Sequence, residues 1–91
     1  MTDYLLENQT TNGSGEVKRI RGVRTVTVFG TPDGATVTIE ISNDAGVNWV
    51  STGTDGEFTT AGSTNVYGFG SIRATVSGAG ASTDLSSAVS S

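Results

Sequence analysis

Apolar and polar residues alternate with a period of two along much of this chain. Residues 35–42 show it most clearly, with four apolar side chains on one side and four polar side chains on the other. Residues 71–77 repeat the pattern, with Ile72, Ala74 and Val76 on the apolar side. Because successive side chains of a β-strand point to opposite faces, both segments are predicted to be strands with one face in the core.

Turn-forming residues separate the alternating segments at short intervals. In residues 30–34, Pro32 sets φ for a turn, Asp33 can cap it and Gly34 tolerates a positive φ. Further predicted turns lie at 43–46, 53–56 and 78–81, and further strands at 23–29, 47–50, 57–60, 64–67 and 84–89. About seven or eight short strands with such spacing predict an all-β fold, a small antiparallel β-sandwich or jelly-roll-like domain.

Residues 42–49 resemble the Asp-box, a hairpin motif of the form Ser-x-Asp-x-Gly-x-(Thr/Asn)-Trp. Asp44 can accept hydrogen bonds from backbone N–H groups in the turn, and Gly46 tolerates a left-handed backbone. Trp49 would pack its ring onto the core. In sialidases and other families this hairpin stabilises the fold away from the active site, so the resemblance implies a hairpin rather than sialidase activity. The less favoured alternative makes Asp44 a metal ligand, although turn aspartates usually cap backbone groups.

The first part of the chain lacks the alternating pattern. Residues 1–22 are therefore predicted to be an extended N-terminal arm and linker, and residues 23–91 the β-sandwich domain. Within the first part, residues 1–15 show no periodicity. Residues 16–22 are interpreted as an edge strand or as the root of the arm.

Length and composition limit the kind of protein this is. Ninety-one residues suffice for one domain with a thin core, so binding to a partner would add to a small stability margin. Cysteine is absent, which excludes disulfides and thiolate metal sites and fits synthesis in a reducing cytoplasm. No apolar run is long enough for a membrane helix, so no membrane association is expected.

Catalytic chemistry has little support in the sequence. Histidine and cysteine are both absent, which removes the commonest general base and the strongest nucleophile. The glycine pair in 68–70 completes no phosphate-binding motif and indicates a turn or a close backbone approach. We therefore expect no enzymatic activity, no cofactor and no bound metal. The carboxylates that lie in or beside predicted turns, where capping explains them, are Asp33, Asp44, Asp55 and Glu57.

The charges are unevenly distributed. The net charge is -4, yet four of the five basic residues fall within residues 18–24, and Arg73 is the fifth. This cluster is either a solvated edge strand protected from aggregation or an electrostatic dock for an acidic partner. A nucleic-acid interface would need more cations with interleaved aromatic residues, so no direct contact with nucleic acid is expected. The apolar patch near the N-terminus is either a frayed end or an anchor that orders on binding. The predicted partner-binding residues are Tyr4, Leu5 and Leu6 as apolar anchors, with Lys18, Arg19 and Arg21 as the charge complement.

Together these features resemble bacteriophage virion proteins, and capsid cement (decoration) proteins above all. The segments that carry the likeness are 22–30, the Asp-box-like hairpin at 42–49, and 72–78. The resemblance implies a structural protein made in the host cytoplasm and seated on the capsid exterior as a dimer or trimer. Its partner would be the major capsid protein or another virion protein, whose neighbouring subunits the arm would clamp.

Two alternatives remain open at this point. One is a tail or fibre structural subunit, which differs from a cement protein only in its location. The other is a carbohydrate-binding module for host recognition, with Trp49, Tyr67 and Phe69 as the platform for a sugar ring, although core packing explains Trp49 better.

Overall fold

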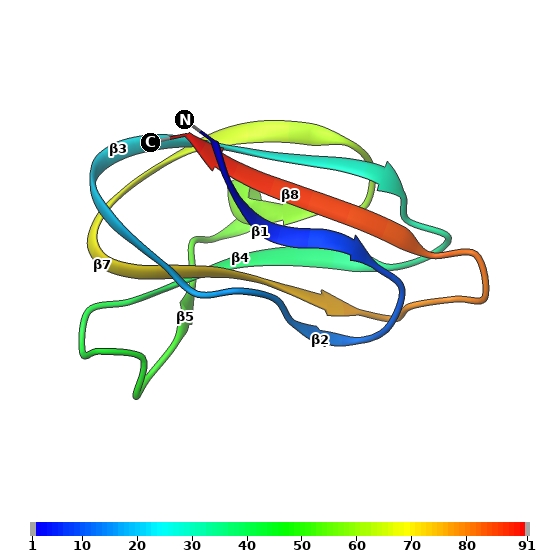
Figure 1. Ribbon diagram of the computed structural model, residues 1–91, viewed down its shortest axis with the longest axis horizontal. Helices are drawn as coiled ribbons and strands as arrows, with labels where there is room; N and C mark the ends of the chain where they lie inside the picture. The colour runs from blue at the N-terminus through cyan, green and yellow to red at the C-terminus, as the bar shows by residue number, and fades with distance from the viewer. Residues whose placement is uncertain (1, 91) are drawn as a thin grey trace.

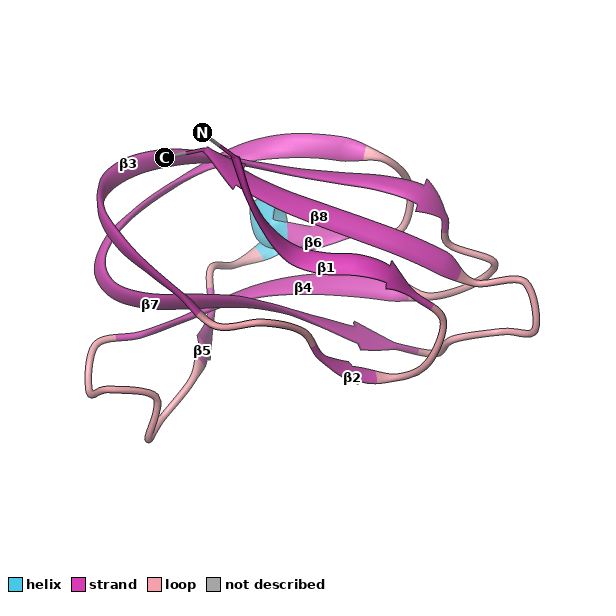
Figure 2. Ribbon diagram, in the orientation of Figure 1, coloured by secondary structure: helices cyan, strands magenta, loops and turns pink. Residues whose placement is uncertain are grey.

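The computed structural model describes the backbone of residues 2–90 and, except at Thr2, Asp3, Asp55 and Phe69, their side chains. The chain is built almost entirely from β-strands (Figures 1 and 2). The helical structure in this range is one 3₁₀ turn, Thr54–Gly56. The strands are β1 (Thr2–Gln9), β2 (Gly13–Ser14), β3 (Lys18–Thr31), β4 (Thr36–Ser42), β5 (Val50–Ser51), β6 (Glu57–Phe58), β7 (Gly62–Ser77) and β8 (Asp84–Ser90).

All strand pairs are antiparallel and belong to one sheet. The order along the sheet is β1-β8-β3-β7-β4-β5, with β2 added beside β7 and β6 beside β4. The predicted all-β, antiparallel fold class is therefore confirmed. The two layers of the predicted sandwich arise from one sheet that folds over on itself, because the long strands β3 and β7 curve together at one end of the molecule (Figure 1).

Glycines explain where the sheet folds. Gly22 of β3 pairs directly with Gly68 of β7, and two residues away Ile20 pairs with Gly70. Gly22 and Gly70 have φ values of +82° and +133°, which residues with a Cβ rarely adopt. Glycines within strands commonly mark tight corners of folded sheets. We call the paired segments 19–24 and 66–70 the bend.

The core lies between the two layers and takes apolar side chains from both. β7 contributes Ile72, Ala74 and Val76, which the alternation predicted to point inward, and each is at most 1% exposed. Buried residues from the other strands and the connecting turn are Leu5, Leu6, Ile20, Val26, Val28, Ala35, Val37, Ile39, Val66, Leu85 and Val89.

The prediction of an extended arm over residues 1–22 is wrong. Residues 2–9 form β1, which pairs with β8 at the end of the sheet, and residues 18–22 already belong to β3. The described chain is thus one domain from its first strand, with no boundary at residue 23. The alternation of residues does not predict β1, because its pairing with β8 shifts register between Tyr4 and Leu6. Leu5 and Leu6 are therefore both buried although they are adjacent in the chain.

Residues 15 and 16 tie β1 to the opposite layer. The Gly15 amide donates a hydrogen bond to the Ala74 carbonyl of β7 at 3.0 Å, and the Glu16 amide donates to the Leu5 carbonyl of β1 at 2.8 Å. A Cβ at Gly15 would overlap the Leu5 carbonyl oxygen, so the contact requires glycine. These two bonds fix the N-terminal strand across the open side of the fold.

Candidate functional site

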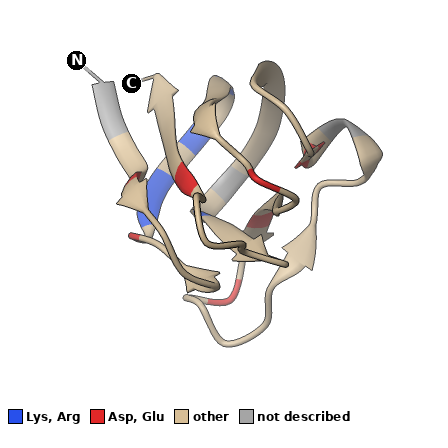
Figure 3. Ribbon diagram, turned by 90° about the vertical axis from the view of Figure 1, so that its right-hand side faces the viewer, with Lys and Arg blue, Asp and Glu red and all other residues tan. Residues whose placement is uncertain are grey.

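Four of the five basic residues lie on β3, in and beside the bend (Figure 3). Up to Thr25, β3 pairs with β7 alone, since its pairing with β8 starts at Val26. Within the described chain, residues 18–24 thus have a strand partner on one edge only, and the Thr25 amide donates to the Ser90 hydroxyl at 3.0 Å. The side chains of Arg19 and Arg21 are exposed there.

Three arginines surround a hollow of about 370 Å³ at the bend. We call it the arginine hollow, and the residues that line it are Arg19, Ile20, Arg21, Arg24 and Gly70. Among the described residues, the ion pairs are Lys18 with Glu16 at 3.4 Å and Arg73 with Glu40 at 2.8 Å. The arginines of the hollow take part in neither pair. The Arg24 guanidinium donates one hydrogen bond, to the Val23 carbonyl at 3.0 Å.

The predicted partner-binding residues separate into two groups. Arg19 and Arg21 lie together at the arginine hollow, as the charge pattern suggested, and Lys18 lies beside them in its pair with Glu16. Tyr4 is 45% exposed on β1, whereas Leu5 and Leu6 are 0% and 2% exposed. The prediction that these two leucines are partner anchors is wrong, because their side chains form part of the core.

Sequence reasoning left Arg24 out of the predicted binding residues, although it noted the basic cluster that contains it. Its register places Arg24 on the side of β3 that carries the core valines Val26 and Val28. The bend opens the sheet at this end, so that Arg24 is partly exposed and lines the hollow.

The Asp-box-like segment forms a projecting loop between β4 and β5 (Figure 1). Its hydrogen bonds centre on Asp44, which accepts from the Asn48 backbone amide at 2.9 Å, the Asn48 side chain at 2.7 Å and the Ser42 hydroxyl at 2.7 Å. These bonds favour the charged carboxylate and lower the pKa of Asp44 to about 2, with the Asn48 backbone amide as the largest cause. The predicted capping role of Asp44 is confirmed.

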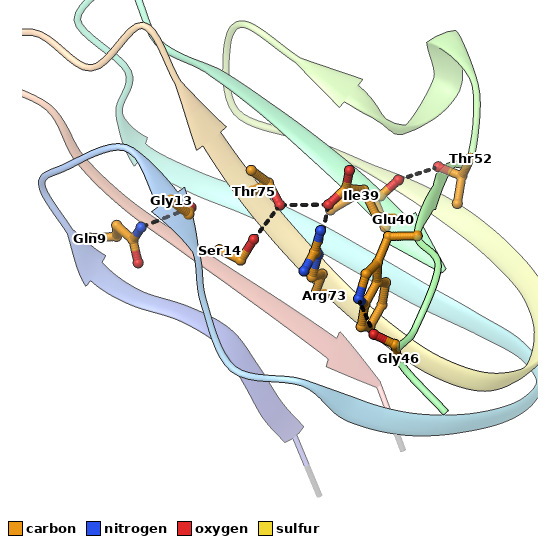
Figure 4. Close-up of polar contacts among 10 residues, drawn as sticks. Gln9, Gly13, Ser14, Ile39, Glu40, Gly46, Thr52, Arg73 and Thr75 are labelled. Carbon is orange, nitrogen blue, oxygen red and sulfur yellow. Dashed lines mark hydrogen bonds and ion pairs between the residues drawn. The ribbon is translucent and has the colours of Figure 1, made fainter. Parts of the chain in front are cut away.

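Trp49 ends this loop and lies over the outer face of the sheet. Its indole N–H donates to the Gly46 carbonyl at 3.1 Å, and the Arg73 guanidinium carbon lies 4.3 Å from the ring centroid (Figure 4). Arg73 in turn donates to Glu40 at 2.8 Å. One face of the indole is thus occupied by a cation that is itself held in place. The Phe69 side chain, another member of the predicted sugar platform, lies outside the described residues, and Tyr67 is 67% exposed.

A row of hydrogen bonds continues from Glu40 across three strands (Figure 4). Thr75 of β7 donates to Glu40 at 2.6 Å, and its hydroxyl lies 2.8 Å from that of Ser14 on β2. Burial raises the pKa of Glu40, but the hydrogen bonds from Thr75 and Arg73 and the Arg73 charge together outweigh burial and lower it. Glu40 is therefore an ionised structural group that links β4 to β7.

A second hollow, also of about 370 Å³, adjoins the bend on the side of the projecting loop. We call it the apolar hollow, and the residues that line it are Ile41, Ser42, Asn43, Asn48, Val50 and Gly68. Val50 is 64% exposed, and Val47 on the same loop is 76% exposed. Large exposed apolar side chains around a concavity are typical of contact surfaces.

Within residues 2–90, no three acidic side chains that are described lie close enough to hold a metal ion, and no helix there is long and apolar enough to cross a membrane. The chain matches no protein-family model, no curated protein and no solved structure. The bend and its two hollows are therefore the features that bear on function.

Proposed function

We propose that this protein is a non-enzymatic structural component of a bacteriophage virion that binds the capsid exterior and stabilises the shell. The observation that carries the proposal is the group of three arginines at the bend, which has no carboxylate partner among the described residues. Three arginines that line one concavity carry the same charge, and an acidic partner surface would complement them.

The composition of the surface around the bend supports a protein partner. Arginine beside exposed apolar side chains is the mixture that is enriched in protein interfaces. Here Arg21 lies two residues before Val23 on β3. Val23 is 56% exposed and pairs with the exposed Tyr67. A surface of this kind would bind the major capsid protein or another virion protein.

The mechanism of stabilisation is mass action. A protein that binds assembled capsid subunits, and not separated ones, shifts the equilibrium towards the assembled shell. Assembly of this chain as a dimer or trimer would join several weak contacts into one stable attachment. Because β1 is part of the sheet, the predicted N-terminal arm is not available to clamp capsid subunits. In this proposal the exposed bend contacts the capsid instead.

Co-sedimentation with undecorated phage capsids tests the proposal. We expect saturable binding at a fixed number of copies per capsid, together with a higher capsid melting temperature. Capsids that already carry a cement protein provide the matched control and should bind little. Absence of binding and of any shift in melting temperature would contradict the proposal.

Two further measurements separate the other locations and partners. Binding to isolated tails but not to capsids would place the protein as a tail or fibre subunit. Specific binding on a glycan array would instead indicate a carbohydrate-binding module. The contact between Trp49 and Arg73 counts against the sugar platform, because a sugar ring would have to displace a guanidinium held by Glu40.

A further inference from the structure

We propose that the arginine hollow and the apolar hollow form one docking site for an extended segment of a partner protein, in which a carboxylate side chain and a bulky apolar side chain stand two residues apart on one face. This inference rests on the proposed function only in taking the partner to be a protein. It adds the chemistry of the segment and the place where it binds.

The two hollows lie beside each other along β7. Gly70 lines the arginine hollow and Gly68 lines the apolar hollow, and both belong to β7. Residues two apart in a strand lie about 7 Å from each other, which is also the spacing of side chains on one face of an extended peptide. A Cβ at Gly70 would overlap the carbonyl oxygen of Ser42, which lines the apolar hollow. The walls are therefore in contact at this point.

The arginine hollow favours a carboxylate. Planar guanidinium groups bind carboxylates through paired hydrogen bonds, and three arginines line this hollow. A nucleic acid offers the same charge, but it presents a row of phosphates. This chain carries five basic residues and a net charge of -4, so it lacks a basic track beyond the bend.

The apolar hollow supplies the second contact. Ile41 and Val50 form its apolar walls, and at Gly68 the wall is bare backbone. A Cβ at Gly68 would meet its nearest atom, Ile20 Cδ1, at 3.7 Å, which is ordinary van der Waals contact. Its second contact would be with Ile41 Cδ1 at 4.0 Å, so packing does not require glycine there, and a side chain added beside Ile41 would narrow the hollow.

Three acetylated, amidated pentapeptides test the inference in an NMR titration of the ¹⁵N-labelled protein. They are Gly-Asp-Gly-Leu-Gly (the Asp-Leu peptide), Gly-Asn-Gly-Leu-Gly without the charge (the Asn-Leu peptide) and Gly-Asp-Gly-Ala-Gly without the bulky side chain (the Asp-Ala peptide). We expect the Asp-Leu peptide to shift the amide signals of Arg21, Gly68 and Gly70. Binding should weaken about tenfold for the Asn-Leu peptide and about fivefold for the Asp-Ala peptide.

Variants locate the site within the fold. Arg21→Gln should weaken binding of the Asp-Leu peptide about tenfold. Thr31→Gln is the control, since it places the same side chain at an exposed position of β3 that lines neither hollow, and should leave binding within about twofold. Gly68→Ala should keep the fold and weaken the Asp-Leu peptide more than the Asp-Ala peptide.

Three results would overturn the inference: no signals shift at the two hollows, the three peptides bind equally, or an oligothymidylate competes the peptide away with higher affinity. The titration contains no capsid, so it stands apart from the test of the proposed function. Peptide binding without capsid binding would refute the virion role alone. Capsid binding that Arg21→Gln leaves unchanged would refute this docking site alone.

Discussion

Strand β1 provides the sharpest test of the architecture, because the sequence pattern and the structure disagree about it. The structure predicts that Leu5→Ala combined with Leu6→Ala unfolds the protein or brings it close to unfolding. Both leucines are core residues, with 0% and 2% exposure. An extended arm would lose nothing from the same change, so the double variant separates the two descriptions.

The size of the effect follows from the burial. Each Leu→Ala substitution in a core costs about 2–5 kcal/mol, so the pair costs about 4–10 kcal/mol if the two are roughly additive. At ~0.05–0.15 kcal/mol per residue, a domain of this length has about 5–14 kcal/mol of stability in total. The loss is thus comparable to the whole free energy of unfolding.

Urea denaturation followed by circular dichroism and by Trp49 fluorescence measures the loss. Tyr4→Ala is the matched control, because Tyr4 lies on the same strand but is 45% exposed, and it should cost about 1 kcal/mol or less. The reasoning is refuted if the double variant unfolds cooperatively at the same urea concentration as the control. A folded protein that lacks residues 2–9 would refute it as well.

Three smaller predictions concern a hydroxyl, a carboxylate and the bend. Ser87 is 0% exposed and its hydroxyl has no hydrogen-bond partner within the described chain, so Ser87→Ala should stabilise the protein by about 1 kcal/mol in urea denaturation; a loss of stability would contradict this. The Asp44 carboxyl should titrate by NMR with a pKa of about 2. Its contribution to the stability of the loop is therefore present above pH 3.8 and is lost as the pH falls towards 2. A titration midpoint near 3.8 would show that its hydrogen bonds are absent in solution. Gly22→Ala should cost about 1–2 kcal/mol through backbone strain alone. Gly70→Ala should cost clearly more in the same thermal melts, because its Cβ also meets a carbonyl oxygen, and equal losses would contradict the close approach.

Much of the fold could be predicted because apolar and polar residues alternate along the sequence of a half-buried strand. Residues 35–42 were expected as a strand and 36–42 form β4, while the predicted strand at 84–89 corresponds to β8 at 84–90. The predicted strands at 64–67 and 71–77 are parts of the single long strand β7. The glycines between them suggested a break, whereas the strand continues through them and bends.

The N-terminal strand could not be predicted, because its side chains do not alternate. A register shift beside Leu6 turns two neighbouring leucines into the core, which no pattern of period two reveals. The hydrogen bond from Glu16 to Leu5 joins residues eleven apart and depends on the tertiary fold. For this reason the local sequence predicts a free arm where the structure has a strand.

Only the positive charge of the candidate site could be predicted from the sequence. The cluster of cations in residues 18–24 pointed to an electrostatic surface, and two predicted arginines line the hollow there. The apolar hollow was not foreseen, since it combines residues from β4, β5, β7 and the projecting loop. The spacing of residues in the sequence also does not show that Gly70, which lines the arginine hollow, lies close to Ser42, which lines the apolar hollow.

The most direct test of the central claim is a cryo-electron microscopy map of capsids that have been incubated with the purified protein. The account predicts ordered density on the capsid exterior in which the bend, with Arg19, Arg21 and Arg24, faces acidic side chains of the shell. Capsids without added density, or a bound protein whose bend points into solvent, would contradict it.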